Sequence, residues 1–252
     1  MKVEALKPAW RSALITGGST GIGASLARRL VAEGSKVLVC ARRTDLLESM
    51  EKELGPSFMF IKTDLSSSEQ AADLVSQAVD RLGSLDLVIA NAGFRINKPA
   101  AQLSPQDVLS VLHVNLLSAC ATLTASIPYM IGTGGHLVGI SSIAGVRGMP
   151  NSAAYSTSKA GLSTFLESIR IDLRGTGINV TDIRPGFVAT PLTQDNEFRM
   201  RFLLSADEAA RLILRAVRRK RRVYTFPWQM AIGARLLRIA PNALFDKLAS
   251  KS

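Results

Sequence analysis

Short apolar runs of the strand type alternate with helix-like stretches along most of this 252-residue chain. The runs are apolar without interruption, which indicates strands buried on both faces of a sheet. The stretches between them have helical periodicity, and glycines at Gly34, Gly55 and Gly83 close or follow three of them. Repeated strand–helix units predict an α/β fold built on a doubly wound parallel sheet. The expected strands are 13–16, 37–41, 58–63, 85–90, 137–141 and 178–183, and expected helices include 22–33, 46–54 and 71–82.

Capping residues predict where two later helices begin. Ser104 is followed by Pro105 and by an acid at Asp107, which predicts the start of a long helix. Ser205 and Glu208 have the spacing of a capping box, so another helix is expected to begin there.

The net charge of +11 belongs almost entirely to the end of the chain. Residues 199–252 hold 13 Lys or Arg against 3 Asp or Glu, whereas residues 1–198 hold 18 against 17. A nearly neutral body with a basic tail is not the charge pattern of a chain that binds nucleic acid over its whole surface. The tail therefore needs an explanation of its own.

Other classes of site and location are not indicated. No apolar stretch approaches the roughly 20 residues that span a bilayer, and residues 1–11 lack the apolar core of a secretory signal. We therefore expect no transmembrane helix and a cytoplasmic protein. The two cysteines and the two histidines lack metal-ligand spacing and are expected to be structural, so no metal site is expected; they are Cys40, Cys120, His113 and His136.

A glycine-rich turn follows the first expected strand directly. Residues 16–23 read TGGSTGIG, with the spacing G-x-x-x-G-x-G, and open the first helix. Glycines at these positions let the backbone turn tightly and approach a pyrophosphate, whose charge the helix N-terminus favours. At the first strand–helix junction of a parallel sheet, this turn predicts a dinucleotide site.

Four motifs in order carry a family resemblance. TGGSTGIG, Asn91-Ala92-Gly93, Tyr155-x-x-x-Lys159 and Pro185-Gly186 resemble the motif set of the classical short-chain dehydrogenases/reductases over residues 11 to about 191. The resemblance implies a Rossmann-type NADP-binding catalytic part in residues 1–198. Residues 199–252 are then expected to add a helix, a strand and a basic amphipathic tail to the same single domain.

The resemblance also implies the residues that hold the dinucleotide. Asp64 would contact the adenine, Asn91 and Gly93 would line the adenosine ribose region, and Thr190 would hold the nicotinamide amide. The complete expected set is Gly17, Ser19, Thr20, Gly21, Ile22, Gly23, Arg42, Arg43, Asp64, Leu65, Asn91, Ala92, Gly93, Tyr155, Lys159, Pro185, Gly186, Val188 and Thr190.

The end of the second strand favours NADP(H). An NAD-selective site places an acid there to bind the ribose 2′-hydroxyl, but this chain has Ala41 followed by Arg42 and Arg43. Guanidinium groups have a fork geometry that suits the oxygens of a 2′-phosphate.

Tyr155 and Lys159 are the expected catalytic pair. Their spacing places both side chains on one face of a helix expected over residues 152–171. A free tyrosine has a pKa near 10, and a neighbouring ammonium favours the phenolate, so Lys159 is expected to tune Tyr155. The phenol would donate a proton to a carbonyl oxygen as hydride arrives at carbon, and the reverse step would oxidise an alcohol.

Two more residues complete the expected constellation. Ser142 ends the fifth strand, where its hydroxyl can hydrogen-bond the same substrate oxygen, and its neighbour Ser141 is the weaker candidate. Asn115 lies inside the long helix that begins at Ser104. By resemblance it would hold a water in a proton relay from Lys159, and from the residues alone it could equally be a buried polar group satisfied by backbone.

The substrate and the assembly are less specified. Segments 94–97, 146–151 and 187–204 are expected to shape a largely apolar pocket that also carries arginines, which favours a lipophilic ketone or a 3-oxoacyl compound. Phe198 and Arg199 are among its expected residues. By resemblance, the helix with Tyr155 would take part in a homodimer or homotetramer.

Alternatives remain open. The chain could be an inactive NADP-binding sensor or scaffold, although both Tyr155 and Lys159 are present. The basic tail could bind nucleic acid without sequence preference. Residues 228–240 combine Trp and Leu with Arg235 and Arg238, as in a helix lying on a membrane surface, but they could instead cover the substrate pocket or contact another subunit.

Overall fold

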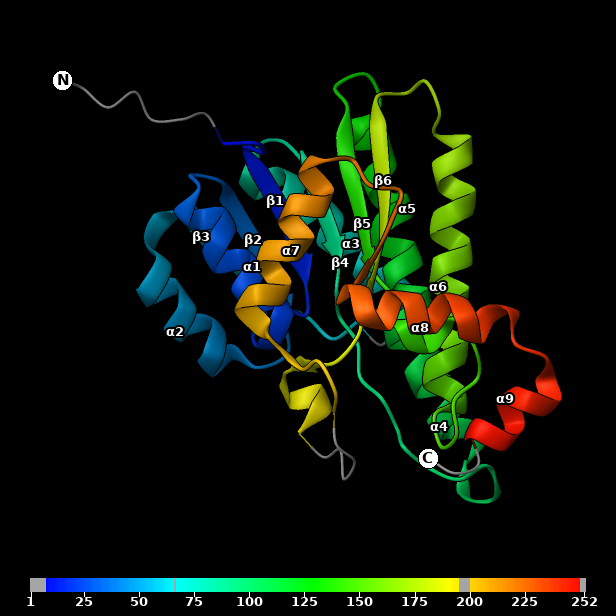
Figure 1. Cartoon of the computed structure of the whole chain (residues 1–252). Coiled ribbons are helices and arrows are strands. Elements are labelled where there is room, and N and C mark those ends of the chain that lie inside the picture. The colour runs from blue at the N-terminus through cyan, green and yellow to red at the C-terminus, as the bar shows by residue number, and fades with distance from the viewer. Residues whose placement is uncertain (1–7, 66, 195–199, 250–252) are drawn as a thin grey trace.

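Seven parallel strands form the central sheet of the structure, in the order β3-β2-β1-β4-β5-β6-β9 (Figure 1). The structure, a computed structural model, describes residues 8–65, 67–194 and 200–249. The strands are β1 (Ser12–Thr16), β2 (Lys36–Ala41), β3 (Phe58–Lys62), β4 (Leu87–Ala90), β5 (Gly135–Ile140), β6 (Ile178–Pro185) and β9 (Val223–Phe226). A separate two-stranded pair joins β7 (Val188–Ala189) to β8 (Leu204–Ser205).

The strand order reverses between β1 and β4. The chain leaves β1 toward β2 and β3 and then returns to pair β4 on the other side of β1. At such a switch point the loops after the two strands diverge, which leaves room for a ligand at their carboxyl ends. The glycine-rich turn after β1 and the Asn91-Ala92-Gly93 motif after β4 lie at this place.

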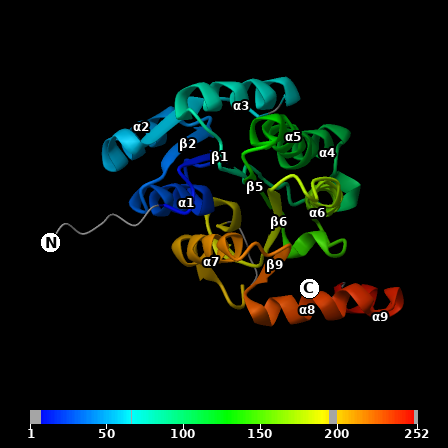
Figure 2. The ribbon, with the colours of Figure 1, turned by 90° about the horizontal axis from the view of Figure 1, so that it is seen from above.

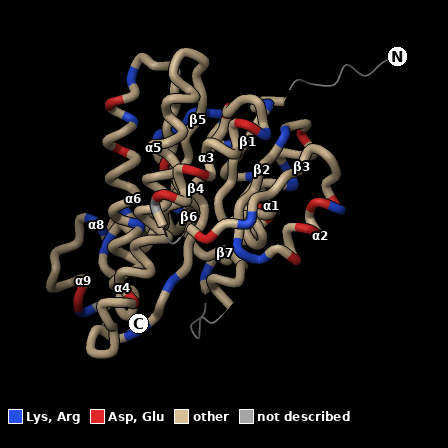
Figure 3. The backbone as a smooth tube through the Cα atoms, turned by 180° about the vertical axis from the view of Figure 1, so that it is seen from behind, with Lys and Arg blue, Asp and Glu red and all other residues tan. Residues whose placement is uncertain are grey.

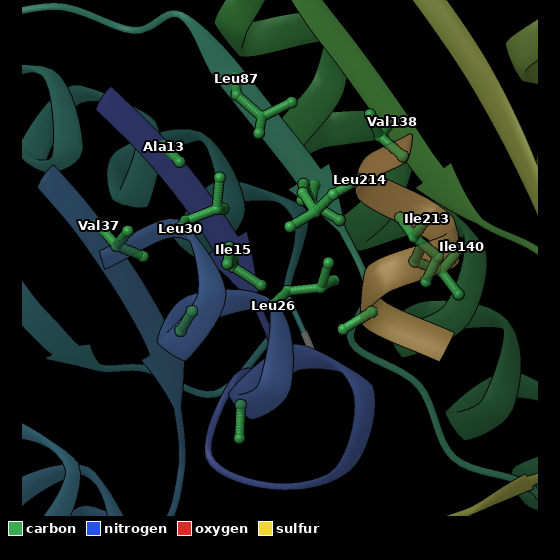
Figure 4. Close-up of a cluster of buried hydrophobic side chains, with 14 of the residues drawn as sticks. Ala13, Ile15, Leu26, Leu30, Val37, Leu87, Val138, Ile140, Ile213 and Leu214 are labelled. Atoms are coloured by element: carbon green, nitrogen blue, oxygen red, sulfur yellow. The ribbon is translucent and has the colours of Figure 1, made fainter. Parts of the chain in front are cut away.

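Helices cover both faces of the sheet, as Figure 2 shows from above. Helices α1 (Gly21–Ala32), α2 (Thr44–Leu54) and α7 (Ala206–Arg218) pack on one face. Helices α3 (Ser68–Leu82), α5 (Ser118–Met130) and α6 (Ala153–Asp172) pack on the other, with α4 (Pro105–Leu112) against α6. Figure 4 shows the first core, where Leu26 and Leu30 of α1 and Ile213 of α7 meet the sheet. Burial on both faces explains why the strand sequences are apolar without alternation.

The predicted fold class is confirmed: this is a doubly wound Rossmann-type sheet in a single domain. The predicted capping box forms between Ser205 and Glu208. The predicted N-cap Ser104 also forms a capping box, with Asp107. Lys/Arg and Asp/Glu are interspersed along α2 and α6 in Figure 3, in keeping with the nearly neutral body.

The helix that begins at Pro105 differs from expectation in one respect. It is interrupted by a π-helical segment, His113–Leu117, before α5 continues. The whole run, Pro105–Met130, is 26 residues long with a mean hydropathy of 1.7, so its length and composition would suit a membrane span. The expectation of no such helix considered only uninterrupted apolar stretches. In the fold, this run contacts α3 and α6, and 33% of its most apolar 18-residue window is buried.

The C-terminal segment continues from the sheet and packs back on the body of the domain. The edge strand β9 leads directly into α8 (Trp228–Ile239), and α9 (Asn242–Ala249) follows (Figures 1 and 2). Met230 of α8 lies against Gly186, where an added Cβ would be 2.4 Å from its sulfur. Arg147 holds the other end of α8, because its guanidinium donates to the carbonyls of Leu237 and Ala240. The segment therefore lies on the body of the domain.

Candidate active site

The glycine-rich turn forms a cradle at the N-terminus of α1. Gly17 has a φ of +67°, and a Cβ there would lie 2.6 Å from the Cα of Ala92, so this position excludes a side chain. The N-cap residue Thr20 makes no side-chain capping bond, and the first turn of α1 has no acid. The first N–H groups of the helix therefore remain available to a pyrophosphate, and the residues fit a dinucleotide.

The turn is fastened to the loop after β4 by two side chains. The buried hydroxyl of Thr16 accepts hydrogen bonds from the N–H groups of Asn91 at 3.0 Å and Ala92 at 3.1 Å. The amide of Asn91 donates in return to the carbonyls of Thr16 and Gly17, at 3.0 and 2.9 Å. Asn91 thus holds the shape of the cradle. Thr16 directly precedes the paired glycines but is not among the site residues predicted from the sequence.

The loop after β6 closes the cradle from the opposite side. A Cβ at Gly21 would lie 2.9 Å from the Cγ2 of Thr190, so Thr190 touches the glycine-rich turn. Pro185 ends β6, Val188 is buried in β7, and Gly186 lies under Met230. The structure therefore brings the first and last cofactor motifs of the sequence together.

The arginines after β2 lie beside the same turn. The Nη2 of Arg43 donates to the Oγ1 of Thr20 at 2.9 Å, and Arg42 is exposed next to it. Asp64 and Leu65 follow β3, with Asp64 exposed and Leu65 buried. The basic pair thus lies at the strand ends next to the N-terminus of α1, where a ribose 2′-phosphate would bring negative charge.

The Ser142 hydroxyl lies close enough to the Tyr155 phenol to lower its pKa. Ser142 follows β5 and caps the short helix Ile143–Gly145, where its Oγ accepts from the N–H of Ala144 at 3.1 Å. Burial raises the pKa of the Tyr155 phenol, and the Ser142 hydroxyl and the positive charge of Arg95 both oppose that rise. Arg95 belongs to segment 94–97, for which the sequence predicts only a place in the wall of the substrate pocket.

Lys159 lies one helical turn after Tyr155 and is almost fully buried. Its ammonium donates to the carbonyl of Ile140 at 2.8 Å and lies 5.8 Å from the centre of the Tyr155 ring. Burial lowers the pKa of Lys159 to about 8, and the negative charge of Asp182 opposes that fall. The lysine is therefore mainly protonated at neutral pH but close to its titration range.

The contacts of Asp182 distinguish Ser141 from Ser142 as the serine that can bond a substrate oxygen. The hydroxyl of Ser141 donates to the Asp182 carboxylate and lies 3.0 Å from the carbonyl of Ile183. Arg184 donates its Nε to the other oxygen of the same carboxylate at 2.7 Å. Ser141 is thus occupied inside the sheet, and Ser142 is the hydroxyl next to Tyr155.

Asn115 lies in the π-helical segment and is fully buried. Its Oδ1 accepts from the N–H of Phe94 at 2.9 Å, and its Nδ2 donates to the carbonyl of Phe94 at 2.8 Å and to Ser158 at 3.1 Å. A Cβ at Gly93 would lie 3.1 Å from Asn115 Oδ1 and 3.4 Å from Lys159 Nζ. Asn115 therefore ties the loop after β4 to α6, while the water-holding role implied by resemblance stays a prediction.

The comparisons with known proteins agree with this geometry. A family model described as short chain dehydrogenase matches residues 11–200. An uncharacterized oxidoreductase of Myxococcus xanthus is 40% identical over 96% of this chain and 97% of its own length. The ketoacyl reductase HetN of Nostoc is 32% identical over 83% of this chain and 76% of its own length.

A solved structure also has the same fold. The crystal structure of a short chain dehydrogenase/reductase from Burkholderia phymatum in complex with NAD superposes with a TM-score of 0.83. It covers 90% of this chain and 92% of its own, at 23% sequence identity. At that identity, the likeness concerns the fold alone.

Proposed function

Because this chain belongs to the short-chain dehydrogenase family of oxidoreductases, we propose that it interconverts a carbonyl compound and the corresponding alcohol with NADP(H). The observation that carries the proposal is the arrangement of the buried Lys159 ammonium 5.8 Å from the Tyr155 ring, with the Ser142 hydroxyl near the phenol. This group stands at the carboxyl ends of β4, β5 and β6, next to the cradle that fits a dinucleotide.

Each residue has a definite task with a proton or an oxygen atom. A bound nicotinamide supplies the hydride in reduction and takes it in oxidation. The Tyr155 hydroxyl donates its proton to the substrate carbonyl oxygen, and the Ser142 hydroxyl donates a hydrogen bond to the same oxygen. Lys159 places a positive charge beside the phenol, which stabilises the phenolate left after the proton transfer.

The environment of Tyr155 supports proton donation at neutral pH. Because burial raises the pKa of the phenol, Tyr155 is protonated there and ready for the reductive direction. Alcohol oxidation instead requires the phenolate, which the positive charges of Arg95 and Lys159 favour. We therefore expect oxidation to speed up with rising pH and reduction to be the faster direction near neutrality.

The preference for NADP(H) over NAD(H) rests on Arg42 and Arg43. Arg43 is held over the glycine-rich turn by its bond to Thr20, and Ala41 stands where an acid would bind the ribose 2′-hydroxyl. Each phosphate contact from a guanidinium contributes on the order of 1.5–3 kcal/mol, which is roughly ten- to a hundredfold in affinity.

Fluorescence titration with NADPH and NADH tests this preference directly. The unchanged protein is expected to bind NADPH at least about tenfold more tightly, and the double variant Ala41→Asp, Arg42→Ser is expected to favour NADH. The matched control is Arg174→Ser, an exposed arginine at the far end of α6. Equal affinity of the unchanged protein for both cofactors refutes the argument from Arg42.

The proposed substrate is a lipophilic ketone or a 3-oxoacyl compound. The segments expected to form the wall of the substrate pocket combine apolar side chains with arginines. Examples are Val146, Phe187 and Phe202 beside Arg147. Phe198 and Arg199, also expected there, lie outside the described residues. A relative named as a ketoacyl reductase supports the acyl class. A screen of NADPH consumption over acyl, steroid, retinoid and small carbonyl panels tests it, and activity confined to sugars would contradict it.

Homo-oligomerisation, cytoplasmic location and peripheral membrane contact remain predictions. The inactive-scaffold alternative predicts cofactor binding without turnover on any panel. Nucleic-acid binding through the tail predicts filter retention of DNA that weakens with salt.

A further inference from the structure

A cleft of about 380 Å³ lies between α8 and the edge strand β9, outside the catalytic group. Four arginines line it from three different elements: Arg184 from β6, Arg221 from the turn before β9, and Arg235 and Arg238 from α8. Small residues of α8, Ala231 and Ala234, face the strand and leave the space open. The arginines are thus gathered by the fold from segments up to 54 positions apart.

The positive charge in this cleft is largely uncompensated. Arg184 is paired with the buried Asp182 at 2.7 Å. Among the described residues, no carboxylate forms an ion pair with Arg221, Arg235 or Arg238. By contrast, Arg28, Arg29 and Arg218 on the surface each have a carboxylate partner. Like charges around one hollow attract an anion into it.

The unpaired side of the edge strand β9 lies beside the cleft. The N–H of Asp182 donates to the carbonyl of Arg222, and the N–H of Gly186 donates to the carbonyl of Phe226. Val223 and Thr225 therefore direct both their N–H and their C=O groups away from β6, toward the unpaired edge, so the backbone there offers donors and acceptors alike. Val223 and Thr225 also line the cleft. The guanidinium forks of the arginines are the groups that suit the oxygens of a phosphate.

We propose that this cleft binds a phosphate group. The bound phosphate group lies against Val146, which lines the cleft. Val146 belongs to the segment between Ser142 and Tyr155, so binding in the cleft contacts the expected wall of the substrate pocket. The proposal is independent of the reaction and cofactor proposed above.

The outer face of α8 indicates two sources for the phosphate. Four large apolar side chains are exposed along it: Trp228 at 68%, Ile232 at 49%, Leu236 at 60% and Ile239 at 79%. They alternate with Arg235 and Arg238 on the same helix. The phosphate therefore belongs either to the headgroup of an anionic lipid, with the apolar face at the membrane surface, or to a soluble phosphate compound.

Calorimetric titration with inorganic phosphate tests the cleft itself. The full-length protein is used with its cofactor site saturated by NADP⁺, or by NAD⁺ if that binds more tightly, so that phosphate does not enter there. The double variant Arg235→Gln, Arg238→Gln is expected to weaken phosphate binding about tenfold or more for each arginine removed. The matched control is Arg211→Gln, Arg215→Gln, which removes the same charge from exposed positions on α7.

Vesicle flotation separates the two sources. Phosphatidylglycerol vesicles are compared with phosphatidylcholine vesicles at low and high salt, for the same proteins and for Trp228→Ser, Ile239→Ser. A lipid source predicts salt-sensitive binding to the anionic vesicles that both the arginine and the apolar double variants lose. A soluble source predicts phosphate binding that the apolar variant retains, without flotation. The proposal is overturned if neither probe binds, or if the α8 arginine variant behaves like the α7 control.

Discussion

Arg147 fastens the C-terminal segment to the active-site loop, and its replacement should release that segment. Its Nη1 donates to the carbonyls of Leu237 at 3.0 Å and Ala240 at 2.7 Å, at the end of α8. Its Nη2 donates to the side chain of Asn242 at 2.7 Å, and its guanidinium lies 4.1 Å from the centre of the buried Phe245 ring. In Arg147→Met the aliphatic stem remains but all these donors are lost.

The size of the effect follows from these contacts. The two partly buried bonds from a charged donor contribute about 1.5 kcal/mol each, at the low end of the range for such bonds. The cation–π contact adds about 0.5–1 kcal/mol, and the exposed bond to Asn242 adds little. A loss of roughly 3–4 kcal/mol raises the population of the undocked segment about 10²–10³-fold.

Hydrogen exchange measures this population directly. Amides of α8 near Ala240 and of α9 are expected to lose about two to three orders of magnitude of protection, while α1 and α3 exchange as before. Arg147→Lys serves as the control, because it retains the charge but not the forked guanidinium. Its protection in α8 and α9 should lie between that of the unchanged protein and that of Arg147→Met. Unchanged protection of α8 and α9 in Arg147→Met would refute the role of Arg147.

Two further predictions concern the groups around the site. The charge of Arg95 opposes the rise that burial causes in the pKa of Tyr155, so Arg95→Leu should move the onset of alcohol oxidation to higher pH, whereas Arg95→Lys should not. The measurement is the pH–rate profile of each variant, and coincident profiles for the unchanged protein and Arg95→Leu would exclude the effect. Thr16→Val removes the acceptor of two backbone N–H groups and should lower the free energy of unfolding by about 2–4 kcal/mol in urea titrations. Thr16→Ser, which keeps the hydroxyl, should lose less, and an equal loss in both variants would count against the hydrogen bonds as the cause.

Features with local causes were predictable from the sequence. The helix starts at Ser104 and Ser205 depend on capping residues three positions apart, and both helices begin there as expected. The strands β1 to β6 were found because burial on both faces leaves an unbroken apolar run, although β4 begins at Leu87 rather than Leu85. One reason for the later start is that the N–H of Asp86 donates to the side chain of Ser12 and not to a strand.

Features that depend on distant partners were not predictable. The π-helical segment around Asn115 accompanies bonds to Phe94 and Ser158, which lie 21 and 43 positions away. The link from Thr16 to Asn91 spans 75 positions. The sequence also could not tell the inner face of α8 from the outer one, because apolar periodicity is the same for a protein and a lipid surface. Met230 faces Gly186, while Ile232 and Ile239 are exposed.

The central claim is that Tyr155 transfers the proton while a bound nicotinamide transfers the hydride. Single-turnover reduction of an active carbonyl compound by prebound NADPH, followed at the nicotinamide absorbance, tests it most directly in Tyr155→Phe. The account predicts unchanged NADPH affinity and melting temperature, and a hydride-transfer rate about 10²–10⁴-fold lower, the usual contribution of general acid catalysis. A rate in Tyr155→Phe close to that of the unchanged protein would contradict it.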